Sequence, residues 1–161
     1  MLPGLTLREM TVADGPAINT LAARCPDKGL ISVYSVYRDN ALESLQALRP
    51  NTVSVAAEVS DHDGLIGMAQ VSFDRCRIEG AMFPCALFNT LMVHPDFRRR
   101  GVARKLSEWR MEQARLCFGD KGVIMADIQM GNRASVGTVK KWCNRMLPDR
   151  KSTRLNSSHR L

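Results

Sequence analysis

The sequence predicts an α+β domain built on a mixed, mostly antiparallel central sheet with flanking helices. Two patterns carry this prediction. Apolar and polar residues alternate through the middle of the chain, as in paired strands, whereas the flanking segments show the i, i+3, i+4 spacing of amphipathic helices. The predicted order is βααβββαβα, in which successive strands favour antiparallel hairpins and the strand–helix–strand unit favours a parallel pair.

The N-terminal third contains one predicted strand and two predicted helices. Residues 5–8 alternate like a short strand. Residues 11–16 carry a helix-start signal, and the helix that they open is stopped by the Pro- and Gly-containing segment 26–29. A second helix is predicted over residues 40–49, with Asn40 as its N-cap.

Three predicted strands fill the middle of the chain. Residues 52–59 alternate with a period of two, and the polar turn 60–64 leads into a return strand over 65–73. After a second turn, the mostly apolar run 81–93 is predicted to form a central strand.

A strand–helix–strand–helix pattern follows. The loop 98–101 precedes a helix over 102–117, a strand over 123–129 and a helix over 133–145. The first of these helices carries an apolar arc that is predicted to pack on the sheet: Val102, Ala103, Leu106, Trp109, Ala114, Leu116 and Cys117.

Residues 149–161 differ from the rest of the chain because they show no hydrophobic period. The run that starts at Asp149 resembles the conceptual translation of a sequencing-adapter oligonucleotide, so we interpret 149–161 as an artefactual or disordered tail. The alternative is a genuine basic tail that binds nucleic acid or a membrane surface. The tail contributes four basic residues and one acid, and without it the net charge of +7 falls to +4.

The composition argues against several classes of protein. No run approaches the about 18 consecutive apolar residues of a membrane span, and residues 1–8 lack the layout of a secretory signal, which predicts a soluble, cytoplasmic protein without a membrane partner. The five cysteines are odd in number and form no C-x-x-C pair, so neither a disulfide framework nor a metal site is predicted.

The predicted loop before the helix at 102–117 has the features of an anion site. Arg98, Arg99 and Arg100 supply guanidinium groups, while Gly101 and the small Ala103 allow close approach of a ligand. The first N–H groups of a helix are unpaired and lie at the positive end of its dipole, which suits a pyrophosphate. A solvated basic loop and a nucleic-acid contact are the alternatives.

The segment from Leu91 to Ala103 resembles the coenzyme-binding motif of the GNAT superfamily of acyl-CoA-dependent N-acetyltransferases. It reads Leu-Met-Val-His-Pro-Asp-Phe-Arg-Arg-Arg-Gly-Val-Ala. In the family, a strand is followed by the sequence R/Q-x-x-G-x-G/A and then by a helix, and residues 98–103 are similar to that sequence. The V-x-P element at Val93 and Pro95, the strand order, and Asn132 at the opening of the next helix extend the resemblance.

The resemblance covers residues 5–147 and implies an N-acetyltransferase domain over residues 1–148. Members of this superfamily normally continue into two more strands after the helix predicted at 133–145. We therefore expect the domain to be incomplete at its C-terminus, with its last two strands missing, and to fold poorly in isolation.

The resemblance also implies acetyl-CoA as co-substrate and no metal. The pantetheine arm would pair with the backbone of Leu91, Met92 and Val93, as a strand pairs with a sheet edge. The other implied coenzyme contacts are Arg98, Arg99, Arg100, Gly101, Val102, Ala103, Arg104, Asn132 and Ser135.

The implied reaction is direct attack of a neutral primary amine on the thioester. A backbone N–H near Met92 or Val93 would stabilise the oxyanion of the tetrahedral intermediate. Glu58, acting through water, and His94 are the candidate bases. Many GNAT enzymes protonate the thiolate with a tyrosine seven residues after the helix-opening asparagine, but that position here is Val139.

The missing tyrosine and the lack of a clear base also fit a GNAT-like module that binds acyl-CoA without catalysis. A nucleic-acid-binding domain would differ from both in an affinity that falls steeply with salt, and we predict no nucleic-acid partner. The sequence does not identify the acceptor amine, and it is compatible with a homodimer.

Overall fold

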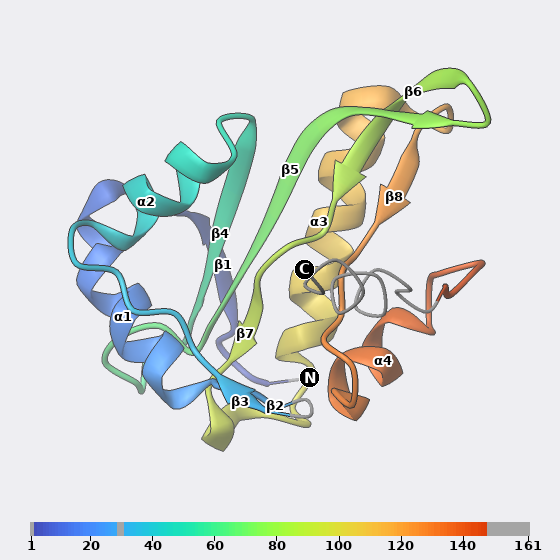
Figure 1. The fold of residues 1–161 in the computed structure, drawn as a ribbon. Coiled ribbons are helices and arrows are strands. Elements are labelled where there is room, and N and C mark those ends of the chain that lie inside the picture. Colours follow the sequence, from blue (N-terminus) through green and yellow to red (C-terminus); the bar gives the residue numbers. More distant parts are fainter. Residues whose placement is uncertain (1, 29–30, 148–161) are drawn as a thin grey trace, which may run out of the picture.

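The computed structural model describes residues 2–28 and 31–147. Its main sheet has six strands in the order β1-β4-β5-β6-β8, with β7 also paired to β5 (Figure 1). All pairs in this sheet are antiparallel except β6 with β8, which confirms the mixed, mostly antiparallel prediction. The strands are β1 (Thr6–Glu9), β4 (Thr52–Glu58), β5 (Gly67–Ile78), β6 (Ala81–Leu87), β7 (Leu91–Val93) and β8 (Val123–Met125).

Helices cover both faces of this sheet. Helices α1 and α2 share one apolar cluster with Ala56 and Met68, whereas α3 packs on the opposite face against Val55 and Ala69. The predicted order is confirmed, and a short hairpin of β2 (Asp27–Lys28) and β3 (Ser32–Val33) is added between α1 and α2. The helices are α1 (Gly15–Arg24), α2 (Ala41–Leu48), α3 (Val102–Phe118) and α4 (Arg133–Val139), with 3-10 turns η1 (Val12–Asp14) and η2 (Pro95–Phe97).

Helix α3 buries most of its predicted arc. Val102, Leu106 and Ala114 are almost fully buried, but Leu116 and Cys117 are exposed, which corrects the prediction for those two residues. Each helical residue turns by about 100°, so Leu116 lies about 200° around the helix from Ala114. Its side chain therefore faces away from the sheet.

The predicted strand 81–93 is divided into β6 and β7 by a bulge. Leu87 pairs with Ser72 of β5, but Leu91 pairs with Ala69, so one extra residue lies on the β6–β7 side. Thr90 has a φ of 26°, which is unusual for a residue with a side chain. The bulge turns β7 away from β8.

Beyond the bulge, the edge of β7 that faces away from β5 has no partner strand among the described residues. The N–H of Phe88 donates to the Met125 carbonyl at 2.7 Å, and the β6–β8 pairing ends there. Strand β8 therefore stops at Met125 instead of reaching residue 129 as predicted. Within residues 2–28 and 31–147 no strand follows β8, and the predicted tail, 149–161, lies outside the described residues.

Three charged side chains tie β1 and β4 to the start of α1. The Arg8 guanidinium donates to the Asp14 carboxylate at 2.7 and 2.9 Å and to the Glu58 carboxylate at 2.7 and 3.1 Å. Asp14 also accepts from the N–H of Thr11 at 2.8 Å. The bond from Arg8 is the main cause that holds the pKa of Asp14 below its usual value.

We expect Asp14→Asn to weaken the fold at neutral pH and to weaken it less in acid. The stabilisation by Asp14 is complete above the unfolded pKa of about 3.9 and is lost as the pH falls through the lower folded pKa. Because Arg8 is partly exposed, the expected loss is only about 1–2 kcal/mol near pH 7. Urea unfolding at neutral pH and near pH 3 would measure it, with Glu9→Gln as an exposed control. An equal loss at both pH values would contradict this role.

Among the described residues, no helix combines the length and the hydrophobicity that crossing a membrane requires.

Candidate functional site

The hydrogen-bond register shows which backbone groups of β7 are free. His94 donates its N–H to the Ile66 carbonyl at 2.8 Å, and Gln70 donates to the Thr90 carbonyl at 3.1 Å. Bonded pairs alternate along an antiparallel ladder, so Met92 between them is also bonded to β5. The backbone groups of the residues on either side of Met92 point to the open edge.

This register changes the expected oxyanion donor. The Met92 N–H is directed to β5, so it is not available to a ligand at the open edge, and the free amide beside it belongs to Val93. The Val93 carbonyl is already an acceptor, from Arg98 Nε at 3.1 Å and from the Cys25 thiol at 3.2 Å. Burial raises the pKa of Cys25, which keeps its thiol protonated and able to donate.

The chain leaves β7 and reaches α3 through a loop that frees the first amides of the helix. Arg99 and Gly101 adopt left-handed conformations, with φ of 61° and 91°. The first backbone hydrogen bond of the helix runs from the Lys105 N–H to the Gly101 carbonyl at 3.0 Å, and within the described part of the chain no side chain caps this end. The amides of residues 102–104 therefore have no helical acceptor.

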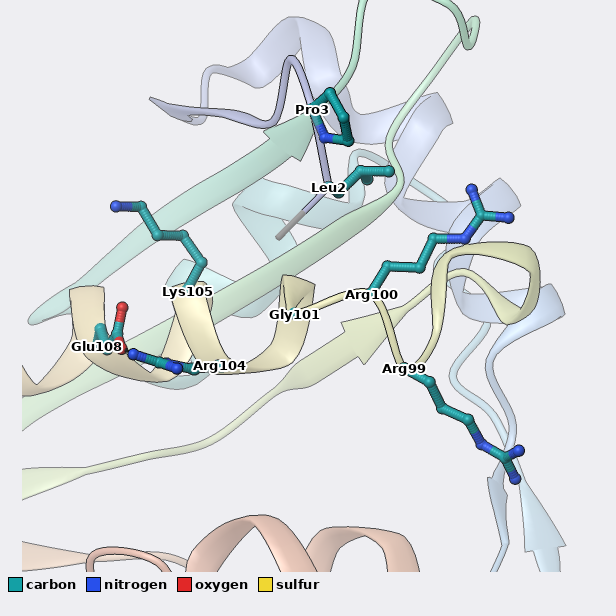
Figure 2. Close-up of a pocket in the computed structure, with 8 residues that line it drawn as sticks. All are labelled: Leu2, Pro3, Arg99, Arg100, Gly101, Arg104, Lys105 and Glu108. Carbon is teal, nitrogen blue, oxygen red and sulfur yellow. Dashed lines mark hydrogen bonds and ion pairs between the residues drawn. The ribbon is translucent and has the colours of Figure 1, made fainter.

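A hollow of about 480 Å³ lies at this helix end (Figure 2). It is lined by Leu2, Pro3, Arg99, Arg100, Gly101, Arg104, Lys105 and Glu108. The N-terminal segment is fixed there, because the Leu2 N–H donates to the Arg100 carbonyl at 3.1 Å. A phosphate in the hollow would meet unpaired amides, the positive end of the dipole and several cations.

The arginines of the loop do not all face this hollow in the same way. Arg99 and Arg100 extend in different directions from the loop, and Arg104 lies along Glu108 (Figure 2), to which its Nε donates at 2.7 Å. Arg98 is bonded to the β7 edge and does not line the hollow. Lys105 also lines the hollow, which the sequence analysis missed. Its position one helical turn after Gly101 could have indicated that it lies near the helix start.

Asn132 and Ser135 form the N-cap of α4. The Asn132 side-chain carbonyl accepts from the Ser135 N–H at 3.0 Å, and its amide donates to the Asp27 carboxylate. Gln129 Nε2 donates to the Ile31 carbonyl at 3.1 Å, so the β2–β3 hairpin contacts the segment between β8 and α4 at two points. The coenzyme contacts expected of Asn132 and Ser135 stay a prediction.

The structure places the two candidate bases in different surroundings, and the catalytic roles expected of them stay predictions. Glu58 is bonded to Arg8 and lies in β4, which β5 separates from β7. His94 is buried, and its Nδ1 accepts from the Asp96 N–H at 3.3 Å. Burial is the main cause that lowers the pKa of His94, so its ring is neutral near pH 7.

A row of polar side chains that the sequence analysis missed lies beside the bulge, on the sheet face that also carries α1 and α2. Thr52 and Ser72 share a hydrogen bond of 2.6 Å, Gln70 Nε2 donates to Ser54 Oγ at 2.9 Å, and the Asn89 amide group lies 3.1 Å from Ser72 Oγ. Gln70 is fully buried, yet its Oε1 has no partner among the described residues. This row gives the centre of the sheet a polar surface.

The fold and the site define an α+β protein with an open strand edge at β7 and, after the next loop, a helix start with unpaired amides and neighbouring cations. The sequence pattern of the acetyltransferase (GNAT) family matches residues 17–144, and the chain belongs to this family. No curated protein sequence matches the chain.

Solved structures show the same fold at low sequence identity. An acetyltransferase from Trypanosoma brucei has a TM-score of 0.66 at 14% identity, over 91% of this chain and 96% of its own. An aminoglycoside 6'-N-acetyltransferase from Acinetobacter baumannii has a TM-score of 0.66 at 16% identity, over 91% and 97%. An aminoglycoside N-acetyltransferase solved in complex with CoA has a TM-score of 0.63 at 17% identity, over 90% and 98%.

Proposed function

We propose that this chain transfers the acetyl group of acetyl-CoA to a primary amine. The observation that carries the proposal is that the loop after β7 joins a strand edge with free backbone groups to a helix start with unpaired amides and neighbouring cations. The edge offers free backbone groups to the two amide units of pantetheine, and the hollow offers amides and cations to the pyrophosphate. Membership of the GNAT family and a structural neighbour solved with CoA support the same coenzyme.

In the proposed reaction the neutral amine attacks the thioester carbonyl directly. A carbon–nitrogen bond forms, the carbonyl oxygen gains negative charge, and the Val93 N–H, which is not bonded to β5, would donate to it. The carbon–sulfur bond then breaks, the electron pair leaves with the sulfur, and the nitrogen loses one proton. The acceptor would approach from the face of α1 and α2, which carries the polar row that contains Ser72 and Asn89.

Calorimetry with acetyl-CoA, followed by a thiol-release assay with a panel of primary amines, tests this proposal. We expect saturable binding that free CoA displaces, and thiol release that depends on the amine. Binding without release for any amine would favour the alternative, an acyl-CoA-binding module without catalysis. Absence of binding to acetyl-CoA would contradict both functions.

A further inference from the structure

Arg110 is a buried cation in α3 that the reaction described above does not use. It is only 3% exposed. Its Nη1 donates to the Asn89 carbonyl at 3.2 Å and its Nη2 to Ser107 Oγ at 3.4 Å, whereas its Nε has no partner among the described residues. Burial lowers the pKa of Arg110 to about 10, so the group stays charged at neutral pH.

The charge of Arg110 has no counter-ion within residues 2–28 and 31–147. None of the ion pairs among these residues includes it, and its two bonds reach a neutral carbonyl and a neutral hydroxyl. A buried cation without an anion is costly, and it is retained where it has a use. The environment of Arg110 would therefore favour an anion beside it.

The guanidinium lies where β7 and β8 begin to diverge. Its contact Asn89 belongs to the bulge, and its carbon centre lies 4.7 Å from the ring centroid of Phe88. The Phe88 N–H makes the last hydrogen bond between the β6 side and β8, to the Met125 carbonyl. The Phe88 ring also contacts the ring of Trp142, just after α4, with centroids 5.2 Å apart. The end of α4 is where many GNAT enzymes carry the tyrosine that Val139 replaces here.

The spacing along α3 matches the length of the coenzyme arm. Arg110 follows Gly101 by nine residues, which at 1.5 Å per residue places it about 13 Å from the proposed pyrophosphate site. The pantetheine arm has about as many chain atoms as four amino-acid residues, so its extended length is roughly 14 Å. An arm that starts at the first amides of α3 and follows the open edge of β7 would therefore bring its sulfur to the level of Arg110.

We propose that Arg110 stabilises the thiolate of CoA as it leaves the tetrahedral intermediate. This inference rests on the proposed acetyl-CoA site. When the carbon–sulfur bond breaks, the electron pair stays on sulfur, and the guanidinium pairs with that negative charge without giving up a proton. The proton from the amine leaves to solvent. Arg110 thus supplies electrostatically what a tyrosine at position 139 would supply as an acid.

Titration of the thiol of bound CoA, followed by the ultraviolet absorbance of the thiolate, tests this assignment. We expect the wild-type protein to lower the pKa of the bound thiol by at least about one unit relative to free CoA. Arg110→Met should abolish this shift, and Arg110→Lys should keep part of it. Ser107→Ala is the matched control, because it removes a contact of the guanidinium but keeps the charge, and it should keep the shift.

Desulfo-CoA provides a second readout that needs only the wild-type protein. Thiolate stabilisation predicts that CoA gains affinity over desulfo-CoA as the pH rises towards the pKa of the free thiol. Equal pH dependence for both ligands, or an unshifted thiol in the wild-type complex, would overturn the role of Arg110. Failure of CoA to bind at all would instead contradict the proposed function itself.

Discussion

Replacement of Gly101 by glutamate is expected to raise the dissociation constant for CoA by at least about 100-fold. Gly101 has a φ of 91°, a conformation that side chains disfavour, and it lies directly before the unpaired amides of α3. A carboxylate at this point would repel the phosphates that the helix end attracts. A loss of about 3 kcal/mol in binding, which corresponds to this factor, is within the range of a lost charged contact. Calorimetry with CoA measures the change.

Gly119→Glu is the matched control for this variant. Gly119 lies at the other end of the same helix, has a φ of 61°, and has no atom within 4 Å of the position that a Cβ would occupy. With a ψ of −135°, it carries a backbone penalty at least as large as that of Gly101, together with the same added charge, far from the hollow. An equal loss of CoA affinity in both variants would show that the coenzyme does not bind at the start of α3.

The loop before α3 and its unpaired helix start could be predicted from the sequence because their features are local. The positive φ at Gly101, the unpaired amides and the neighbouring cations all follow from a few consecutive residues. The role of Glu58 could not be predicted in this way. Its partner, Arg8, lies 50 residues earlier in the chain and meets it only because β1 and β4 pair in one register.

The division of the strand 81–93 had a weak local signal. Asn89 and Thr90 interrupt an otherwise apolar run, yet the same two residues fit a continuous strand equally well. The bulge becomes visible only through the one-residue change of register against β5, which is a property of two strands. The choice between Met92 and Val93 as the free amide depends on that register.

Arg110 could have been found from helical spacing. It lies four residues after Leu106 and four before Ala114, so it belongs to the buried arc of α3. A charged residue within an apolar arc is a signal of a buried ion, but the sequence does not show its partner. That partner, the Asn89 carbonyl, is exposed to Arg110 by the same bulge that opens the edge of β7.

Gly67→Val tests whether the fold depends on the close contact of β5, β7 and α3. A Cβ at Gly67 would lie 2.9 Å from the Met92 carbonyl oxygen, 3.1 Å from Leu106 Cδ1 and 3.2 Å from Val102 Cγ1. These atoms belong to β7 and α3, so they cannot move away from an added side chain unless β7 or α3 shifts. We expect the free energy of unfolding to fall by about 2–3 kcal/mol, as measured by urea denaturation.

The same variant should weaken CoA binding even under conditions in which it stays folded. The open edge of β7 and the first turn of α3 are the two parts of the proposed site, and a side chain at Gly67 pushes against both of them. Gly137→Val is the control, because no atom lies within 4 Å of its Cβ position, and it should leave stability and affinity nearly unchanged. A folded Gly67→Val protein with normal CoA affinity would mean that the coenzyme does not depend on the junction of β7 with α3.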